Sequence, residues 1–237
     1  KNNPELLKDF GYIDWMNSNY KGFLIHARDY KETSSIINIF TSETGIKSLI
    51  FKGKYTNKER FRFSIFNEYS FTYNNNYNLP YIAKFELINQ YIFDTKYYLL
   101  GLYLNELLYK TLREGYDFDK IYMHYKEFLI YISNSSDSQT RLALLFEKML
   151  LQDLGYELSL QENQVLIDNS YYDYDLGEGF KIQSSKHNNY SILGKDLKLF
   201  FMNALICEKT ISNLRLIIKK VFKQIYPELE LLGDKLF

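Results

Sequence analysis

Between Tyr20 and Gln90 the apolar residues fall in short β-branched and aromatic runs that are separated by polar turns. Runs of this kind, without a helical period, predict strands. The five predicted strands are Gly22–Arg28, Ser34–Thr41, Ile46–Lys52, Ile65–Tyr73 and Tyr81–Asn89. Five short strands in about seventy residues favour a small closed barrel, and the OB-fold is the common barrel of that size.

From Tyr97 onwards apolar residues recur at helical spacing instead. The first predicted helix carries the stripe from Leu99 to Leu112, the second that from Ile121 to Ile132. A third covers Thr140–Leu154; Asp137 and Ser138 are its candidate caps and Gly155 its stop signal. Residues 157–192 return to strand-and-turn character. The strands expected there lie near Gln164–Ile167 and Phe180–Gln183, and the helices expected after them are Gly194–Ile206 and Glu208–Tyr226.

These elements predict an α+β protein with three parts. Residues 1–15 form an N-terminal extension, 16–95 an OB-fold β-barrel, and 96–237 an α-helical domain with a small β insertion at about 157–192. A chain of 237 residues with 46% hydrophobic content can bury one large core or two small ones. No apolar run approaches the roughly 20 residues that span a bilayer, so we expect no membrane partner and a cytoplasmic location.

Net charge gives no indication of a nucleic-acid partner, because 29 basic residues balance 29 acidic ones. One local segment differs, since it holds many cations and a single acid, Glu59. The cations are Lys47, Lys52, Lys54, Lys58, Arg60 and Arg62. Phe51, Tyr55, Phe61 and Phe63 alternate among them. Cations neutralise phosphates and aromatic rings stack on unpaired bases, so the segment is a candidate DNA surface; a solvated strand edge is the alternative interpretation.

Several motifs occur in a fixed order along the chain. The first is His26-x-Arg28-x-Tyr30-x-Glu32-x-Ser34, followed by a strand, Gly45, a second strand and Lys52-Gly53. Leu102-Tyr103-Leu104-Asn105-Glu106-Leu107-Leu108, Phe146-Glu147 and Leu154-Gly155-Tyr156 come later. In this order and spacing the chain from Met16 to its end resembles the RecO family. Residues 1–15 resemble the C-terminal tail of the Era GTPase, and an arbitrary tail is the alternative.

The resemblance implies an N-terminal OB-fold and a non-enzymatic mediator of DNA repair and homologous recombination. Such a protein binds single-stranded and double-stranded DNA, anneals complementary strands and, with RecR, helps load recombinase. The resemblance also implies that Arg28, Lys31 and Glu32 lie near the DNA surface. In the sequence, Asp29 and Glu32 are alternative ion-pair partners for Arg28, in place of a phosphate. A helical protein-interaction adaptor, whose barrel is only a scaffold with little DNA affinity, is the rival hypothesis.

The resemblance implies that the third helix binds the acidic, Phe-ended tail of single-strand binding protein. Family members usually have a basic pair immediately before Phe-Glu in this helix. This chain has Leu144 and Leu145 there instead. Arg141 lies one turn earlier on the same face and is the candidate replacement, with Leu144, Leu145 and Phe146 as its apolar partners. In the first helix, Asn105 and Glu106 are expected to cap or to bridge to the barrel rather than to catalyse.

Metal and catalytic chemistry find little support in the sequence. Many RecO-like chains carry four zinc-binding cysteines after Leu-Gly-Tyr, but this chain has only Cys207, so we expect the zinc-free type and no cofactor. Asp173-x-Asp175-x-Gly177-x-Gly179 lacks the later ligands of a calcium loop and is interpreted as a turn. His26, His124 and His187 are scattered, which gives no nucleophile–base pair.

Overall fold

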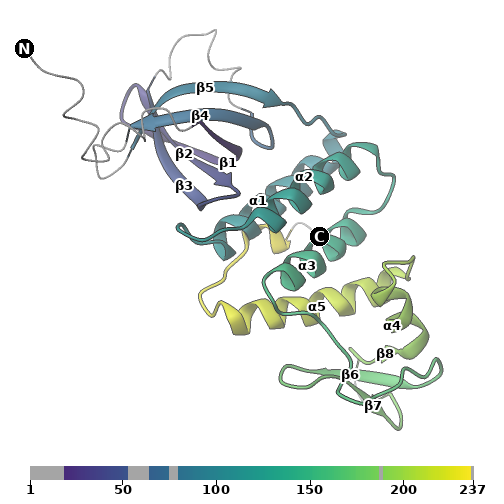
Figure 1. The fold of residues 1–237 in the computed structure, drawn as a ribbon. Helices are drawn as coiled ribbons and strands as arrows, with labels where there is room; N and C mark the ends of the chain where they lie inside the picture. Colours follow the sequence, from purple (N-terminus) through teal and green to yellow (C-terminus); the bar gives the residue numbers. More distant parts are fainter. Residues whose placement is uncertain (1–18, 53–63, 75–79, 187–188, 236–237) are drawn as a thin grey trace, which may run out of the picture. The chain divides into compact units, whose positions relative to one another are not determined.

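The computed structural model describes residues 19–52, 64–74, 80–186 and 189–235, and Figure 1 shows its elements. The chain divides after Asn134 into two compact units. The first contains the strands of the barrel and the first two helices, and the second contains the remaining helices and a small sheet. The domain boundary expected at residues 95/96 stays a prediction. The extension at residues 1–15 lies outside the described residues.

The first unit is built on a closed barrel (Figure 1). Its strands are β1 (Tyr20–Tyr30), β2 (Ser34–Thr41), β3 (Gly45–Lys52), β4 (Glu68–Asn74) and β5 (Tyr81–Asn89). They follow one another around the barrel as β1-β2-β3-β5-β4, and β4 pairs with β1 to close it. This is the five-stranded arrangement of an OB-fold and confirms the predicted barrel.

Five strand ends differ from the prediction by one to three residues, and the backbone explains the largest shift, at the start of β4. β4 begins at Glu68 rather than Ile65 because Phe66 adopts a left-handed φ of 76°, which interrupts an extended strand. β1 continues two residues further, to Tyr30, before Lys31 turns the chain with a φ of 54°.

The barrel core takes alternate side chains from the strands. Its buried cluster consists of Leu24, Ile37, Ile39, Leu49, Tyr69 and Phe71. β2 is buried on both faces, because the other face of the strand is covered by the second helix of the unit. There the Phe40 ring packs on Tyr122 and Tyr125, with ring centres 5.5 and 6.1 Å apart.

Helices α1 (Tyr98–Thr111) and α2 (Asp119–Asn134) follow the barrel, with the short 3-10 helix η4 (Thr95–Tyr97) before them. Asn105 on α1 donates from Nδ2 to the carbonyl of Ile25 on β1, at 3.0 Å. Its Oδ1 accepts from the Tyr125 hydroxyl of α2 at 2.5 Å. One buried amide therefore joins β1, α1 and α2, which confirms that Asn105 bridges to the barrel.

Glu68 makes the corresponding polar junction on β4. Its carboxylate accepts from the Tyr122 hydroxyl at 2.7 Å and from Lys126 Nζ at 2.9 Å, both on α2. Asn89 Nδ2 of β5 donates to it at 2.6 Å. Burial alone would raise the pKa of Glu68, but these hydrogen bonds outweigh burial and hold the pKa below its ordinary value. The group is therefore a buried, fully paired carboxylate.

The second unit combines three helices with a three-stranded sheet. The helices are α3 (Gln139–Asp153), α4 (Gly194–Phe201) and α5 (Glu208–Ile225), and η5 (Leu232–Lys235) is a short 3-10 helix. The sheet has the order β7-β6-β8, with β6 (Tyr171–Asp175), β7 (Gly179–Gln183) and β8 (Ile192–Leu193). α3 lies along α5 (Figure 1), and Arg215 of α5 forms a buried ion pair with Glu147 of α3 at 2.8 Å.

Two expectations for this unit are corrected. Gln164–Ile167 is not a strand: the Ile167 N–H is satisfied by the Tyr172 hydroxyl at 2.8 Å rather than by a neighbouring strand. α4 ends at Phe201 rather than Ile206, because Asn203 takes a left-handed φ of 55°. The turn interpretation of Asp173–Gly179 holds for residues 176–178, which connect β6 to β7, whereas Asp173 and Asp175 belong to β6, a strand that was not predicted, and Gly179 begins β7.

Candidate nucleic-acid interface

The described part of the predicted DNA surface consists of Lys47 and Lys52 on β3 and Arg28 on β1. The other four predicted contacts, Lys54, Lys58, Arg60 and Arg62, lie outside the described residues. Whether the seven cations form one surface therefore stays a prediction. The three described cations differ clearly in their surroundings.

Lys47 is held by groups of its own unit. Its side chain is only 12% exposed, its Nζ lies 3.0 Å from Glu114 Oε1, and it sits 4.7 Å from the centre of the Tyr73 ring. Burial alone would lower the pKa of Lys47, but the hydrogen bond to Glu114 and the neighbouring Tyr73 outweigh it and raise the pKa. Lys47 is thus a charged but already paired lysine, and a phosphate would have to compete with Glu114.

Lys52 is the exposed cation at the end of β3. Its Nζ lies 4.0 Å from the centre of the Tyr81 ring, at the start of β5. The two residues meet because β3 and β5 are neighbours in the barrel, with Ile50 opposite Tyr81. A cation beside an aromatic ring on a strand surface suits single-stranded DNA, because the cation can bind a phosphate and the ring can stack on a base. Tyr81 was not singled out from the sequence, although the OB strand order brings β5 next to β3.

Phe51 does not join this surface. Its ring packs against the buried barrel cluster, with its centre 6.4 Å from that of Phe85. The alternation of side chains along β3 therefore directs Phe51 into the barrel and Lys52 out of it. The other three aromatics of the basic segment, Tyr55, Phe61 and Phe63, lie outside the described residues.

Arg28 is exposed on β1, two residues after His26. The His26 ring stacks on Tyr109 of α1, with ring centres 5.8 Å apart, and lies 3.0 Å from the side-chain amide of Asn38. Burial and then the nearby Arg28 charge lower the pKa of His26, so the ring is neutral near pH 7. The ring of His26 is therefore engaged in contacts within the protein.

The partner-binding residues predicted on α3 are largely buried. Phe146 is 0% exposed and Leu144 is 3% exposed, and both belong to the core of the second unit. Leu145 is half-buried. Because a docked peptide can reach only exposed atoms, Leu144 and Phe146 contribute to the stability of the helix packing. Their predicted role in binding remains without direct support.

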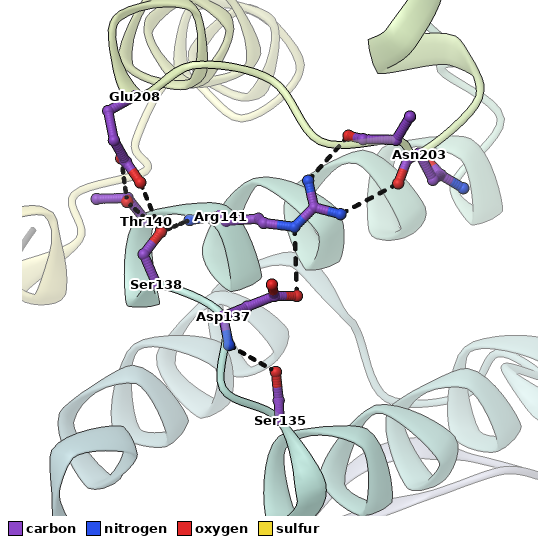
Figure 2. A network of polar contacts seen from close by, with 8 residues as sticks. Ser135, Asp137, Ser138, Thr140, Arg141, Asn203 and Glu208 are labelled. Atoms are coloured by element: carbon purple, nitrogen blue, oxygen red, sulfur yellow. Dashed lines mark hydrogen bonds and ion pairs between the residues drawn. The ribbon is translucent and has the colours of Figure 1, made fainter.

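Arg141 makes three contacts within the unit, which Figure 2 shows. Its Nη1 donates to the carbonyl of Ala204 at 2.9 Å and its Nη2 to that of Asn203 at 3.2 Å. Its Nε lies 3.2 Å from Asp137 Oδ2, close enough for an ion pair though poorly aligned for a hydrogen bond. Beside it, Ser138 caps α3 as predicted by accepting from the Arg141 N–H at 3.3 Å.

Lys148, two turns further along α3, binds the end of α4 in the same way. Its Nζ donates to the carbonyl of Phe200 at 2.8 Å and to Asn203 Oδ1 at 2.7 Å. Carbonyls at the end of a helix lack intrahelical partners and carry partial negative charge, so cations stabilise them. Arg141 and Lys148 together satisfy the end of α4 and the turn after it. The apolar side chains of Met202 and Leu205 in that turn are 69% and 72% exposed.

Among the residues that the structure describes, no three His, Cys, Asp or Glu side chains are grouped as metal ligands. The expectations of a zinc-free protein without a cofactor and without catalytic activity stay predictions. Within the same described ranges, no helix is both long enough and apolar enough to cross a membrane.

A five-stranded OB barrel followed by helices defines a class of proteins that often binds oligonucleotides or oligosaccharides. Two family models match this chain: "Recombination protein O N terminal" over residues 16–91 and "Recombination protein O C terminal" over residues 92–200. The chain therefore belongs to the RecO family, a family of DNA repair and recombination proteins. The N-terminal match begins at residue 16, where the resemblance was expected to start.

Individual relatives support the same assignment. The DNA repair protein RecO of Psychromonas ingrahamii is 30% identical over 192 residues, which cover 75% of this chain and 79% of the relative. The DNA repair protein RecO of Polynucleobacter necessarius is 28% identical over 205 residues, which cover 81% of this chain and 83% of the relative. Similarity thus extends across the barrel and most of the helical region.

Proposed function

We propose that this protein is a DNA repair and recombination mediator that binds single-stranded DNA through its barrel and anneals complementary strands. The observation that carries the proposal is the exposed Lys52 beside the Tyr81 ring on an OB barrel of the RecO family, within the basic segment that runs from Lys47 to Arg62. Cations on this surface would neutralise phosphates, which lowers the repulsion between two strands brought together.

The annealing role is tested by the rate at which two complementary, dye-labelled strands pair. Replacing Lys52, Lys54, Arg60 and Arg62 together by Ala should slow protein-dependent annealing severalfold. The matched control replaces Lys195, Lys198, Lys209 and Lys220, four exposed cations of α4 and α5, and should anneal like the unchanged protein. A larger loss in the control would place the DNA surface on the helices. No loss in either, together with no DNA binding, would favour the protein-adaptor hypothesis.

RecR and the acidic tail of single-strand binding protein are the proposed protein partners. For the tail, the support is a pair of partly buried cations on α3, Arg141 and Lys148, next to the exposed side chains of Met202 and Leu205; the peptide would compete with Asp137 for Arg141. An acidic peptide that ends in Phe needs such a combination of positive charge and apolar surface. RecR would act with the DNA-bound protein in loading recombinase.

The tail contact predicts different results for two substitutions. Arg141→Ala should abolish binding of a tail peptide, but it should also lower the melting temperature because it removes the donor to the Asn203 and Ala204 carbonyls in the turn after α4. Leu205→Ser changes an exposed side chain, so it should weaken peptide binding without altering the melting temperature.

Fluorescence anisotropy of a labelled tail peptide measures the binding, and annealing of strands coated with single-strand binding protein gives the functional result. Both variants should anneal bare strands normally. Unchanged peptide binding by Leu205→Ser would place the tail elsewhere, and equal loss on bare and coated strands would place Arg141 in the DNA site or the fold.

A further inference from the structure

A groove with an acidic rim lies within the second unit. It is lined by the C-terminal part of α5, the segment from Tyr156 to Asn163 and the turn between β6 and β7, and it encloses about 1150 Å³. This volume exceeds what most small-molecule sites need, and it is large enough for several side chains of a peptide.

The charge of the groove has one sign. Glu157, Glu162 and Glu178 line it and are exposed, and the lining contains no Lys, Arg or His. The sequence shows the same bias over a longer stretch, since no basic residue occurs between Lys148 and Lys181. The acids in that stretch are Asp153, Glu157, Glu162, Asp168, Asp173, Asp175 and Glu178. In a chain of net charge zero, this is a pronounced local excess of negative charge.

Part of this charge is compensated internally. Lys181 lies 3.1 Å from Glu178 and 3.3 Å from Asp175, and Gln161 donates to Glu178 at 2.6 Å. Lys148 is close enough to Glu157 for a weak electrostatic attraction between them. Glu157 and Glu162 therefore supply most of the negative charge that an incoming group would meet. No three carboxylates in the described residues converge as metal ligands, so the acids act as separate charges along the groove.

The groove also offers apolar and aromatic contacts. Leu160, Leu176, Val221 and Ile225 contribute aliphatic surface, and Leu176 is exposed. The rings of Tyr156 and Tyr174 line the groove as well, and the Tyr174 ring is braced against Phe180 at 4.8 Å. Tyrosine rings attract Lys and Arg side chains and also pack on aliphatic ones.

We propose that this groove docks a basic segment of a partner protein in which Lys or Arg side chains alternate with aliphatic ones. The acids match the cations, while the aliphatic and tyrosine surface matches the residues between them. DNA is repelled by the same charge, so the groove is an interaction surface separate in function from the basic barrel segment. The proposal does not depend on the DNA-binding function.

The experiment uses a fluorescein-labelled octapeptide of alternating Lys and Leu, with an alternating Glu and Leu peptide as the control probe. The full chain should bind the basic peptide saturably, more weakly as salt rises, and should not bind the acidic peptide. Glu157→Gln combined with Glu162→Gln should weaken binding about tenfold. Glu228→Gln combined with Glu230→Gln removes the same charge from exposed positions outside the groove and should leave the affinity unchanged.

A third variant separates shape from charge. Ser159 lines the groove and is exposed, so Ser159→Trp should narrow the groove without changing its charge. This variant should also weaken peptide binding. Equal effects of the two Glu pairs, no effect of Ser159→Trp, or no saturable binding would each overturn the proposal. Self-association that the basic peptide releases would also overturn it, by assigning the groove to a second copy of the chain.

Discussion

At the scale of single residues, Glu68 shows how a buried carboxylate can join a strand to a helix. The side chain is 3% exposed and receives hydrogen bonds from Tyr122, Lys126 and Asn89. Burial and the neighbouring Glu68 also raise the pKa of the Tyr122 phenol, which keeps it a hydrogen-bond donor at all ordinary pH values. Loss of the carboxylate would leave these donors without their acceptor.

Glu68 should therefore make stability depend on pH. Its pKa is lower in the folded state than the value of about 4.3 for an unfolded chain. The stabilisation is then fully present above the unfolded value and is lost as the pH falls through 4.3 toward the folded value. Glu68→Gln should lower the free energy of unfolding at pH 7 by about 1–3 kcal/mol.

Urea unfolding between pH 7 and pH 3 measures both effects. The difference in stability between the natural protein and Glu68→Gln should shrink as the pH falls. Tyr122→Phe, which removes one donor and keeps the carboxylate, should retain most of the pH dependence. A constant difference across the range would mean that the pKa of Glu68 is the same in the folded and unfolded states, and a difference that grows as the pH falls would mean that folding raises it.

Arg141 illustrates how far a sequence can specify a contact residue. Helical spacing identified it as a cation on the face of α3 that carries Leu144 and Leu145. The pattern gave no information about Asn203 and Ala204, which lie more than sixty residues later and reach Arg141 only through the tertiary fold. The contacts of Lys148 with Phe200 and Asn203 were not predicted for the same reason. The chemistry of a side chain is readable from sequence, but its partners depend on packing between distant segments.

At the scale of elements, the turn between β2 and β3 is the point where the barrel meets the loop between α1 and α2. The Gly115 N–H donates to the Thr44 carbonyl at 3.0 Å, and the Phe118 N–H donates to the Ser42 carbonyl at 2.7 Å. Gly45 has a φ of +69°, and a Cβ there would lie 2.3 Å from the carbonyl oxygen of Arg113. This close approach explains a glycine at the first position of β3.

Gly45→Ala should thus be costly, and Gly115 offers a matched control. Gly115 also has a positive φ, of +93°, but a Cβ there would meet nothing within 4 Å. Gly115→Ala should cost about 1–2 kcal/mol from backbone conformation alone. Gly45→Ala should cost at least about 1 kcal/mol more, because the Cβ also displaces the loop. Equal losses of unfolding free energy for the two variants, measured by urea unfolding, would show that the loop between α1 and α2 moves away from the added Cβ at no measurable cost.

The strands and helices were predicted well where their signals are local. β2 and β5 match their predicted ranges, and α3 begins at the predicted Ser138 cap. The misses occur at Phe66, at Asn203 and in the segment near Ile167, and the strands β6 and β8 were not predicted. At the first two a left-handed backbone ends the element, and at the third a tyrosine hydroxyl replaces a strand partner. Neither the left-handed backbone nor the hydrogen bond from a tyrosine hydroxyl can be predicted from residue type alone.

At the scale of the whole molecule, a net charge of zero conceals two segments of opposite sign. One is the basic stretch from Lys47 to Arg62, and the other is the acidic stretch between Lys148 and Lys181. The first was recognisable from sequence as a candidate DNA surface, and family membership supports that interpretation. The second became a candidate docking surface only when the fold gathered Glu157, Glu162 and Glu178 around one groove.

The central claim is that this chain holds single-stranded DNA by its phosphates, and the salt dependence of binding to a labelled oligothymidine tests it most directly. The logarithm of the association constant should fall linearly with the logarithm of salt concentration, with a slope of about −0.7 for each phosphate neutralised. A slope of about −2 or steeper is predicted, and replacing Lys52, Lys54, Arg60 and Arg62 by Ala should make it shallower. Undetectable binding at low salt, or a slope that this variant leaves unchanged, would contradict the account.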